Sequence, residues 1–476
     1  MIKKNTQHIV KIQSVTAKGF GIGSVNDFTL FVDGGLPGDE VLAHILKVKR
    51  RYGYGKILDI ITSSPSRIKS PCPVSDRCGG CQWQHCEYSA QLGFKKQIAT
   101  DALTRIGGIE NPPVADVIGM EPAAQGGAPL EWRYRNKAVF PVVPADNGDG
   151  FAIGMYAPRS HRIIEVTDCG IQHEAHVGVL RVIKEHMRRH KISAYDETIH
   201  KGLVRHVMVR TGRATGEVMV VLSVNGKKIP GEAELCERLA ALEITTAIIS
   251  RHESKGNAIL GEHFRVLYGP GFIRERLGGK GSTLFRSSPV SIEYQLSAPS
   301  FFQVNPAQAT VLYDVALAQA GLDGTQTVID AHAGVGGVAL YVAQFCKDVI
   351  GVDIVPEAIE DAKKNAVLNG IENARFICGA AEDIIPKLLT DASSRCAPDV
   401  IFLDPPRKGC EPALLDALIS AKIERIVYIS CDPATLARDI KMLVNGGYNL
   451  AVAQPVDMFP MTGKVETSVL LRRDDT

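Results

Sequence analysis

The 476-residue chain lacks any apolar run that approaches the roughly 20 residues of a membrane-spanning helix. Its first residues, Met1 to Gln7, also lack the apolar core of a secretory signal peptide. These two absences argue against a membrane partner and predict a cytoplasmic location. Nothing in the sequence indicates an obligate protein partner.

The chain also lacks an excess of charge of either sign, because its 54 Lys and Arg residues nearly cancel its 52 Asp and Glu residues. The net charge of +2 therefore decides little about partners. Basic residues nevertheless cluster locally, at Lys47, Lys49, Arg50, Arg51 and Lys56. Alone, such a run favours a solvated face, but beside an RNA-binding fold it indicates phosphate contacts.

What is present points to a globular protein of several domains. A hydrophobic content of 45% and a charged content of 22% are typical of globular chains. The length exceeds what one hydrophobic core supports, so we expect between two and four domains. Eleven cysteines in a reducing cytoplasm argue against a disulfide framework and favour metal binding or catalysis for some of them.

The first part of the chain, residues 1–62, predicts a small β-barrel. Short β-rich runs are separated by glycine-rich turns at residues 19–23 and 34–38. About five short strands with glycine corners fit an oligonucleotide-binding barrel. The serine- and proline-containing stretch at residues 63–66 is typical of a linker.

Two further domains are predicted. Residues 67–295 carry a cysteine-rich segment, helices near 89–106 and 173–190 and several strands, which indicates an α+β domain. From about residue 296 to 476, strands alternate with alanine-rich helices, the pattern of an α/β domain with a parallel, Rossmann-like sheet. The predicted fold is therefore a multidomain chain of β-barrel, α+β domain and α/β domain.

A glycine-rich turn in the third domain predicts a nucleoside cofactor. Residues 330–337, Asp-Ala-His-Ala-Gly-Val-Gly-Gly, follow one strand, and Asp353 ends the next, where it could accept ribose hydroxyls. Nicotinamide nucleotides and S-adenosylmethionine both fit this pattern, although the dinucleotide fingerprint is not met cleanly. His332 could be a packed residue at the edge of the same pocket.

Later strand ends carry groups suited to covalent catalysis. Asp404-Pro405-Pro406-Arg407 is similar to the tetrad of amino-group methyltransferases, but its fourth residue is Arg and not an aromatic. This departure favours a carbon target that needs activation by a thiol. Cys431 follows a strand, and a thiolate that adds to carbon 6 of uracil would turn carbon 5 into a nucleophile.

The proton on carbon 5 would then need a base such as Glu466. Cys410 is the rival nucleophile, but it lies past a strand end in a predicted loop.

The amino-terminal cysteines indicate a metal centre. Cys72, Cys78 and Cys81 are closely spaced, with Cys86 nearby and Cys169 far downstream. Four thiolates suit an iron–sulfur cluster, whereas zinc fingers usually show two Cys-x-x-Cys pairs and only one is present here. Spacing does not choose between Cys86 and Cys169 as the fourth ligand.

Taken together, these motifs resemble the RNA uracil-5-methyltransferase family, which forms 5-methyluridine in ribosomal and transfer RNA. The resemblance covers nearly the whole chain and includes an amino-terminal TRAM barrel. The matching motifs are the cysteine group at residues 72–81, Leu203–Arg210, Ser300–Asn305, Leu403–Arg407, Ser430–Pro433 and Thr462–Thr467.

The resemblance implies specific roles for these residues. Cys431 would be the nucleophile and Glu466 the base. Contacts to S-adenosylmethionine or to the target uracil would come from Gln303, His332, Asp353 and Asp404. A 4Fe–4S cluster would be held by Cys72, Cys78, Cys81 and Cys169.

Two positions depart from the family pattern: relatives carry an aromatic residue at 332 and often Asn at 337, where this chain has His332 and Gly337. The barrel and the cluster together favour 23S ribosomal RNA as the substrate. A non-enzymatic RNA-binding protein with a relict methyltransferase domain is the main alternative, but Cys431, Glu466 and Gln303 are all retained. A third interpretation, a nicotinamide dehydrogenase, gives no reason for the barrel, the cysteine cluster or Cys431.

Overall fold

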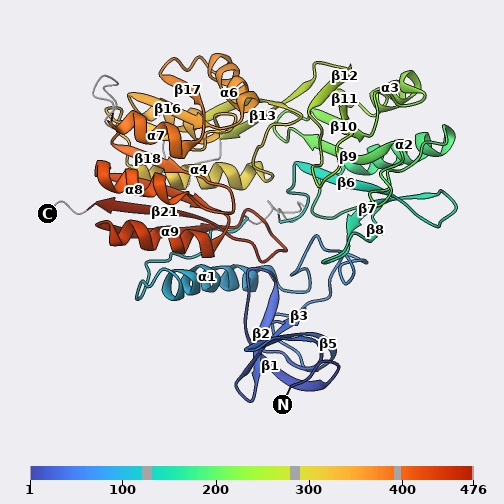
Figure 1. Cartoon of the computed structure of the whole chain (residues 1–476), viewed down its shortest axis with the longest axis horizontal. Helices are drawn as coiled ribbons and strands as arrows, with labels where there is room; N and C mark the ends of the chain where they lie inside the picture. The colour runs from blue at the N-terminus through green and yellow to red at the C-terminus, as the bar shows by residue number, and fades with distance from the viewer. Residues whose placement is uncertain (1, 121–130, 279–289, 391–397, 474–476) are drawn as a thin grey trace, which may run out of the picture.

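The computed structural model describes residues 2–120, 131–278, 290–390 and 398–473, and its first five strands close into a small barrel at one end of the molecule (Figure 1). Alternate side chains of each strand enter the barrel core, as Val10 and Ile12 do in the first strand. The order around the barrel is β1-β2-β3-β5-β4, and the expected barrel is confirmed. The strand bounds are β1 Gln7–Val15, β2 Phe20–Val25, β3 Phe28–Asp33, β4 Glu40–Val48 and β5 Tyr52–Thr62.

Polar contacts hold the stretch at residues 63–66, which the sequence marks as a linker, against the barrel. The Ser64 backbone N–H donates to Asp39 Oδ1 at 2.8 Å, and the Ser64 hydroxyl donates to the Pro37 carbonyl at 2.6 Å. The guanidinium of Arg67 donates to both carboxylate oxygens of Asp39. Because Asp39 is buried, these contacts fix the direction in which the chain leaves the barrel.

A mixed seven-stranded sheet forms the central part of the molecule, with strand order β12-β11-β10-β9-β6-β7-β8. Strands β10 and β11 are parallel, and the helix α3 lies between them in the chain. Its elements are β6 Lys137–Pro144, β7 Phe151–Tyr156, β8 Ile163–Glu165, α2 Ala175–Arg189, β9 Val204–Thr211, β10 Val218–Val224, α3 Glu232–Ala240, β11 Thr246–Arg251 and β12 His263–Tyr268. Residues of α2 and α3 share one buried core with β9 and β10.

The carboxyl-terminal part is a second seven-stranded sheet, ordered β17-β16-β15-β18-β19-β21-β20, in which five strands are parallel and β21 runs antiparallel to both neighbours. This is the α/β fold expected from the sequence. Its elements are α4 Pro306–Ala320, β15 Thr327–Asp330, α5 Gly337–Val342, η1 Ala343–Phe345, β16 Asp348–Asp353, α6 Pro356–Leu368, β17 Ala374–Cys378, α7 Ala381–Thr390, β18 Val400–Leu403, α8 Pro412–Ala421, β19 Arg425–Ser430, α9 Pro433–Asn445, β20 Tyr448–Val456 and β21 Glu466–Arg473.

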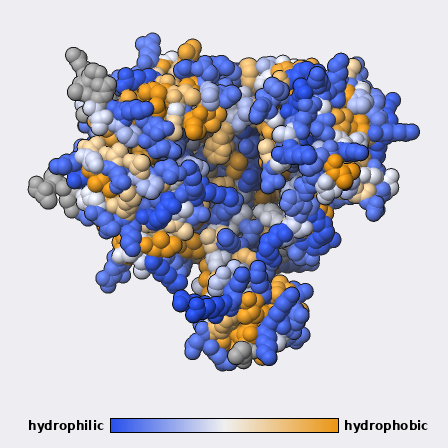
Figure 2. Space-filling view, in the orientation of Figure 1, coloured by the Kyte–Doolittle hydropathy of each residue, from blue (hydrophilic) through white to orange (hydrophobic). Residues whose placement is uncertain are grey.

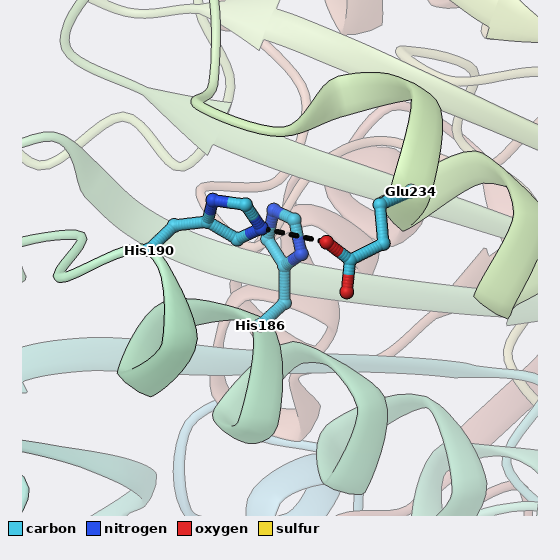
Figure 3. Close-up of side chains that lie close together, drawn as sticks. All are labelled: His186, His190 and Glu234. Carbon is cyan, nitrogen blue, oxygen red and sulfur yellow. Dashed lines mark hydrogen bonds and ion pairs between the residues drawn. The ribbon is translucent and has the colours of Figure 1, made fainter.

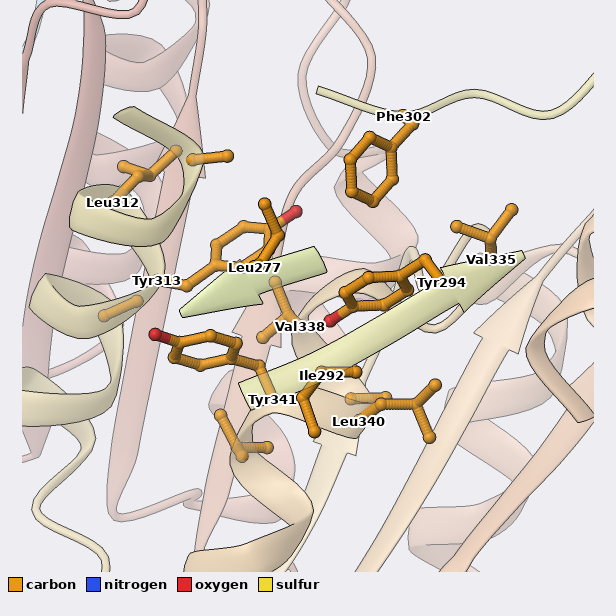
Figure 4. Packing of buried hydrophobic residues seen from close by; sticks show 14 of the residues in the cluster. Leu277, Ile292, Tyr294, Phe302, Leu312, Tyr313, Val335, Val338, Leu340 and Tyr341 are labelled. Atoms are coloured by element: carbon orange, nitrogen blue, oxygen red, sulfur yellow. The ribbon is translucent and has the colours of Figure 1, made fainter. Parts of the chain in front are cut away.

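A two-stranded ribbon, β13 (Phe272–Gly278) and β14 (Ser291–Ser297), connects the two sheets through a shared hydrophobic core. Figure 4 shows part of this core, in which Tyr294, Tyr313 and Tyr341 come from the ribbon, α4 and α5. This core spans the predicted limit at residue 295, and the domain limits at residues 62 and 295 stay predictions. No helix among the described residues is long and apolar enough to span a membrane.

Helix α1 (Tyr88–Arg105) crosses from the amino-terminal region to pack against α9 and β20 of the carboxyl-terminal sheet. The ammonium group of Lys95 on this helix donates to Asp457 Oδ1 and, at 3.0 Å, to the carbonyl of Phe459. Both charged side chains are fully buried, at 0% exposure. The pair therefore joins segments more than 360 residues apart in the chain, in a place where neither charge can be solvated.

We expect Lys95→Met to lower the free energy of unfolding by about 3–5 kcal/mol, because it leaves Asp457 buried without its counter-charge. Lys96→Met is the matched control, since Lys96 is on the same helix and pairs with Asp116 at the surface. An exposed pair of this kind contributes about 1 kcal/mol or less. Urea unfolding of the two variants checks the prediction, and equal losses would contradict it.

Candidate active site

Three predicted site residues, Asp353, Asp404 and Cys431, and Asp330 of the glycine-rich motif lie at the carboxyl-terminal ends of parallel strands. Asp330 ends β15, Asp353 ends β16, Asp404 follows β18, and Cys431 follows β19. Strands β15 and β18 are neighbours, although the chain leaves them toward opposite edges of the sheet. Ligands bind at such a switch point in open α/β sheets. Figure 2 shows that the surface is hollowed between the carboxyl-terminal lobe and the central lobe.

The glycine-rich turn after β15 is held by two carboxylates. Asp330, which is fully buried, accepts the N–H of Ala339 at 2.9 Å and that of His332 at 3.3 Å. Asp353 accepts the N–H of Gly334 at 2.9 Å. Gly334 has a φ of 52°, in the left-handed region that favours glycine. The turn is thus shaped before any cofactor arrives.

His332 lies in this turn, and Gln303 lies just before α4. The Nδ1 atom of His332 is buried and has no hydrogen-bond partner, and burial lowers the pKa of this imidazole to about 4. The backbone carbonyl of Gln303 accepts the side-chain N–H of Asn136 at 3.1 Å, which ties the segment before α4 to the start of the central sheet. A neutral imidazole with an unpartnered nitrogen is suited to contact a ligand.

Cys431 stands between a strand and a helix. Asp432 caps α9 by accepting the N–H groups of Ala434 and Thr435 at 3.0 and 3.2 Å, and Pro433 occupies the first turn. This pattern begins the helix immediately after the cysteine. The thiol is therefore held at the sheet edge and next to the positive end of a helix.

Strand register brings Glu466 next to Cys431. Ser430, the last residue of β19, pairs with Thr467 of β21. The residues that flank this pair, Cys431 and Glu466, therefore lie at the same end of the two antiparallel strands. Glu466 is buried, at 3% exposure.

The carboxyl groups at this edge raise one another's pKa values. Burial raises the pKa of Cys431 to about 11, and Glu466 and Asp404 act in the same direction. Burial and Asp404 raise the pKa of Glu466 well above its ordinary value. Burial and Asp330 raise the pKa of Asp404 to about 7. Because its pKa is raised to about 11, the Cys431 thiol is protonated near neutral pH in the ligand-free protein, and the protonated form of Glu466 is favoured.

Comparison with known proteins identifies the family. A family model described as tRNA (Uracil-5-)-methyltransferase matches residues 286–474, and a TRAM-domain model matches residues 7–58. An RNA methyltransferase of Halalkalibacterium halodurans is 44% identical over 99% of this chain and 98% of its own length. An RNA methyltransferase of Clostridium tetani is 43% identical over 99% of this chain and 97% of its own length. The chain belongs to the RNA uracil-5-methyltransferase family.

A solved member of the family has the same architecture. The crystal structure of Pyrococcus abyssi tRNA (uracil-54, C5)-methyltransferase in complex with S-adenosyl-L-homocysteine covers 98% of this chain and 100% of its own, with 26% identity and a TM-score of 0.73. The amino-terminal barrel of the present chain is accordingly a TRAM domain, and its third domain has the class I methyltransferase fold. The protein is an RNA methyltransferase of the uracil-5 family.

Cys410, the rival thiol of this RNA methyltransferase, is packed in the protein core and does not lie at the edge of the sheet where Cys431 lies. Cys410 is 4% exposed, its N–H donates to Asp439 Oδ2 at 2.9 Å, and it lies near the Tyr428 hydroxyl. Burial raises its pKa to about 12. Cys410 belongs to the core beneath α8, whereas Cys431 has Glu466 and Asp404 as neighbours.

Sequence reasoning missed Tyr313 as a site residue. Tyr313 lies on α4, its hydroxyl hydrogen-bonds the side chain of Gln303, and Asp404 and Glu466 are among the charges around it. A Cβ atom at Gly337 would lie 2.9 Å from this hydroxyl, so Tyr313 fills the space that an Asn side chain at 337 would need. The one signal for this role is that a buried tyrosine hydroxyl needs a hydrogen-bond partner.

Sequence reasoning also missed the cations around the thiol. Arg407 lowers the pKa values of both Cys431 and Glu466, and Lys464 acts on Glu466 in the same direction. Arg407 stands where amino-group methyltransferases have an aromatic residue. In this chain it places a positive charge near Cys431 and Glu466, which favours the anionic form of each.

The pH dependence of thiol alkylation tests the electrostatics of this site. Because the pKa of Cys431 is raised to about 11, we expect its rate with iodoacetamide to rise about tenfold per pH unit from about pH 7 to pH 10. Cys378 at the end of β17 is exposed and serves as the internal reference, which should label faster at neutral pH. Peptide mass spectrometry reports both sites. A rate at Cys431 that levels off below about pH 8 would contradict the account.

Proposed function

We propose that this protein methylates carbon 5 of a uridine in RNA through a covalent adduct between Cys431 and the uracil ring. The observation that carries this proposal is the placement of Cys431 beside Glu466 at the switch-point edge of the methyltransferase sheet. The uracil-5 specificity of the family supports the same target atom.

The two side chains would act in sequence. The Cys431 thiolate adds to carbon 6 of uracil, and the electron pair of the C5–C6 bond moves to form an enolate. Carbon 5 then bonds to the methyl carbon as the donor's carbon–sulfur bond breaks. Glu466 takes the proton from carbon 5, the double bond re-forms, and the thiolate leaves carbon 6.

S-adenosylmethionine would supply the methyl group as a sulfonium cation. A positive charge at an edge that holds Asp330, Asp404 and Glu466 lowers the pKa values of nearby acids. Cys431 and Glu466 would therefore deprotonate more easily once the methyl donor is bound. Within this pocket, Asp353 would accept the ribose hydroxyls, while Gln303, His332 and Asp404 would contact the cofactor or the uracil.

The RNA substrate we propose is 23S ribosomal RNA, held in part by the TRAM barrel. The exposed turn between β4 and β5 carries Lys49, Arg50 and Arg51, which suits contact with phosphates. Transfer RNA is the second candidate, because the Pyrococcus abyssi protein, described as a tRNA (uracil-54, C5)-methyltransferase, aligns with 98% of this chain. Transcripts of the two RNAs, offered separately to the purified protein, distinguish these substrates.

Variants of the two proposed catalytic residues should fail at different steps. Cys431→Ala should abolish both methyl transfer and covalent capture of RNA, because no enolate forms without addition at carbon 6. Glu466→Gln should accumulate a methylated protein–RNA adduct, because addition and methylation proceed but the proton on carbon 5 has no base. Denaturing gel electrophoresis with labelled methyl donor detects the adduct.

RNA that contains 5-fluorouridine should trap the wild-type protein in the same way, because fluorine cannot leave as a cation. Cys410→Ala is the matched control, since Cys410 is the rival thiol of the same domain and is buried, whereas Cys431 is partly exposed. Turnover in Cys431→Ala, together with loss of turnover in Cys410→Ala, would show that the nucleophile is the other thiol.

We also propose that Cys72, Cys78, Cys81 and Cys169 hold a 4Fe–4S cluster. The four thiols are electrostatic neighbours: burial raises the pKa of Cys81 to about 12, and the other three add to that rise. Four thiolates gathered in one group are the ligand set that a 4Fe–4S cluster takes.

Cys86, the other candidate for the fourth ligand, faces away from this group. It is 1% exposed and packs with Trp83 and Ile98 beneath the barrel, and its thiol lies near the carbonyl of Glu87. Cys81 and Cys169, in contrast, both pack against the same small core around Tyr134. These contacts support Cys169 as the fourth ligand.

The cysteine loop is joined to the segment that carries the base. The N–H groups of Gln82 and Trp83, directly after Cys81, both donate to the carbonyl of Met461 at 3.0 Å. Met461 is five residues before Glu466, has a φ of 65° and is buried. A cluster that fixes the cysteine loop would therefore also fix the path of the chain toward Glu466.

Replacement of single cysteines tests this ligand set. Purified wild-type protein should be brown, with absorbance near 400 nm. Cys169→Ala should lose most of its iron and this absorbance, whereas Cys86→Ala should keep both, because only Cys169 neighbours the other three thiols. Elemental analysis measures the iron content. Stoichiometric zinc without iron in the wild-type protein would contradict the proposal.

A further inference from the structure

Three potential metal ligands meet on the central sheet, away from the cysteines and the methyltransferase edge. His186 lies in the last turn of α2, His190 follows one turn later at its carboxyl end, and Glu234 lies in the first turn of α3. Figure 3 shows that the two rings and the carboxylate point toward one another. One ligand atom from each residue lies within 4.8 Å of the other two.

The hydrogen bonds of His186 leave one nitrogen ready to coordinate. Its Nε2 lies 2.8 Å from the carbonyl oxygen of Pro230, which can only accept, so Nε2 carries the proton. The Nδ1 atom then has a lone pair, and it is buried without a hydrogen-bond partner. Metal-binding histidines commonly have this arrangement, with the second ring N–H donated to a backbone carbonyl.

A glycine makes room for the two rings. Gly231, which caps α3 with a φ of 70°, faces both imidazoles. A Cβ atom there would lie 2.5 Å from Cε1 and Nε2 of His190 and 3.0 Å from Cε1 of His186. Any side chain at this position would displace the rings from their present positions.

The charges around His186 and Glu234 suit a bound cation. Burial lowers the pKa of His186, so its ring stays neutral at physiological pH. His190 and then Arg189 lower the pKa of Glu234, so this side chain is anionic. His190 Nε2 lies 2.9 Å from one carboxylate oxygen of Glu234, and Arg189 Nη1 lies 2.9 Å from the other. Arg189 is 68% exposed and can turn away into solvent.

We propose that His186, His190 and Glu234 form a binding site for a divalent transition-metal ion, with Zn²⁺ as the ion that this ligand set fits best. Two imidazoles and one carboxylate are an established ligand set for zinc, and a fourth position stays open for water. A bound ion would join the end of α2 to the start of α3. The site is separate from the cysteine group and from the methyltransferase edge.

Competition between the intact protein and a chromophoric zinc chelator tests the proposal directly. Wild-type protein should take up one more Zn²⁺ per chain than His190→Gln or Glu234→Gln, or should bind that ion at least about tenfold more tightly, because each variant removes one ligand. His161→Gln is the matched control. His161 also pairs with a glutamate, Glu197, at 2.6 Å, but both side chains are exposed, and within the part of the chain that the structure describes no third ligand joins them.

Thermal unfolding in the presence of Zn²⁺ provides an independent readout, because an ion that binds only the folded state raises the melting temperature. Zinc should raise the melting temperature of the wild-type protein and of His161→Gln, and should not raise that of His190→Gln. Equal zinc uptake and equal shifts in the wild-type protein and both site variants would overturn the proposal. Zinc held by cysteine thiols would give that result, and the three residues would then be a simple ion-pair cluster.

Discussion

The buried ion pair between Lys95 and Asp457 is the contact on which the arrangement of the catalytic edge depends. It holds α1 against the segment that runs from β20 toward Glu466, in a region without water to solvate either charge. On the same segment, Met461 receives hydrogen bonds from the cysteine loop. Two residues later, a Cβ atom at Gly463 would lie 2.8 Å from the Ala17 carbonyl of the barrel. The barrel and the cysteine loop therefore both contact the short stretch of chain that leads to Glu466, the proposed base.

The electrostatics of the edge explain how such a site can stay inactive without its ligands. Asp330, Asp404 and Glu466 lie close together and largely out of water, so each disfavours the ionised form of its neighbours. The thiol of Cys431 is held protonated by the same surroundings. A cationic methyl donor bound at this edge would favour the anionic forms, as Arg407 does for Cys431 and Glu466. The deprotonated forms of Cys431 and Glu466 would therefore become favoured only after the methyl donor has bound.

The parts of the site that are local in the chain could be predicted from the sequence. Cys431 is followed by an N-cap aspartate and a proline, a strand-to-helix pattern that can be read directly, and the glycine-rich turn near His332 is equally local. The barrel and the α/β fold were predictable for the same reason, since periodicity and turn residues determine them. The position of Glu466 beside Cys431 was not, because it depends on the antiparallel insertion of β21 beside β19.

Tyr313 and the cluster of His186, His190 and Glu234 could not be predicted for the same reason, because the role of each depends on contacts with residues that are distant in the sequence. The four-residue spacing of His186 and His190 puts both on one helix face, yet Glu234 comes 44 residues after His190.

The central claim is that this protein forms 5-methyluridine in RNA with Cys431 as the nucleophile. The most direct test is nucleoside mass spectrometry on separated ribosomal and transfer RNA from cells that lack the protein. We expect 5-methyluridine to be lost from the 23S ribosomal RNA of these cells. The wild-type gene should restore it, and a gene that carries Cys431→Ala should not. Unchanged 5-methyluridine in every RNA fraction, or full restoration by Cys431→Ala, would contradict the central claim.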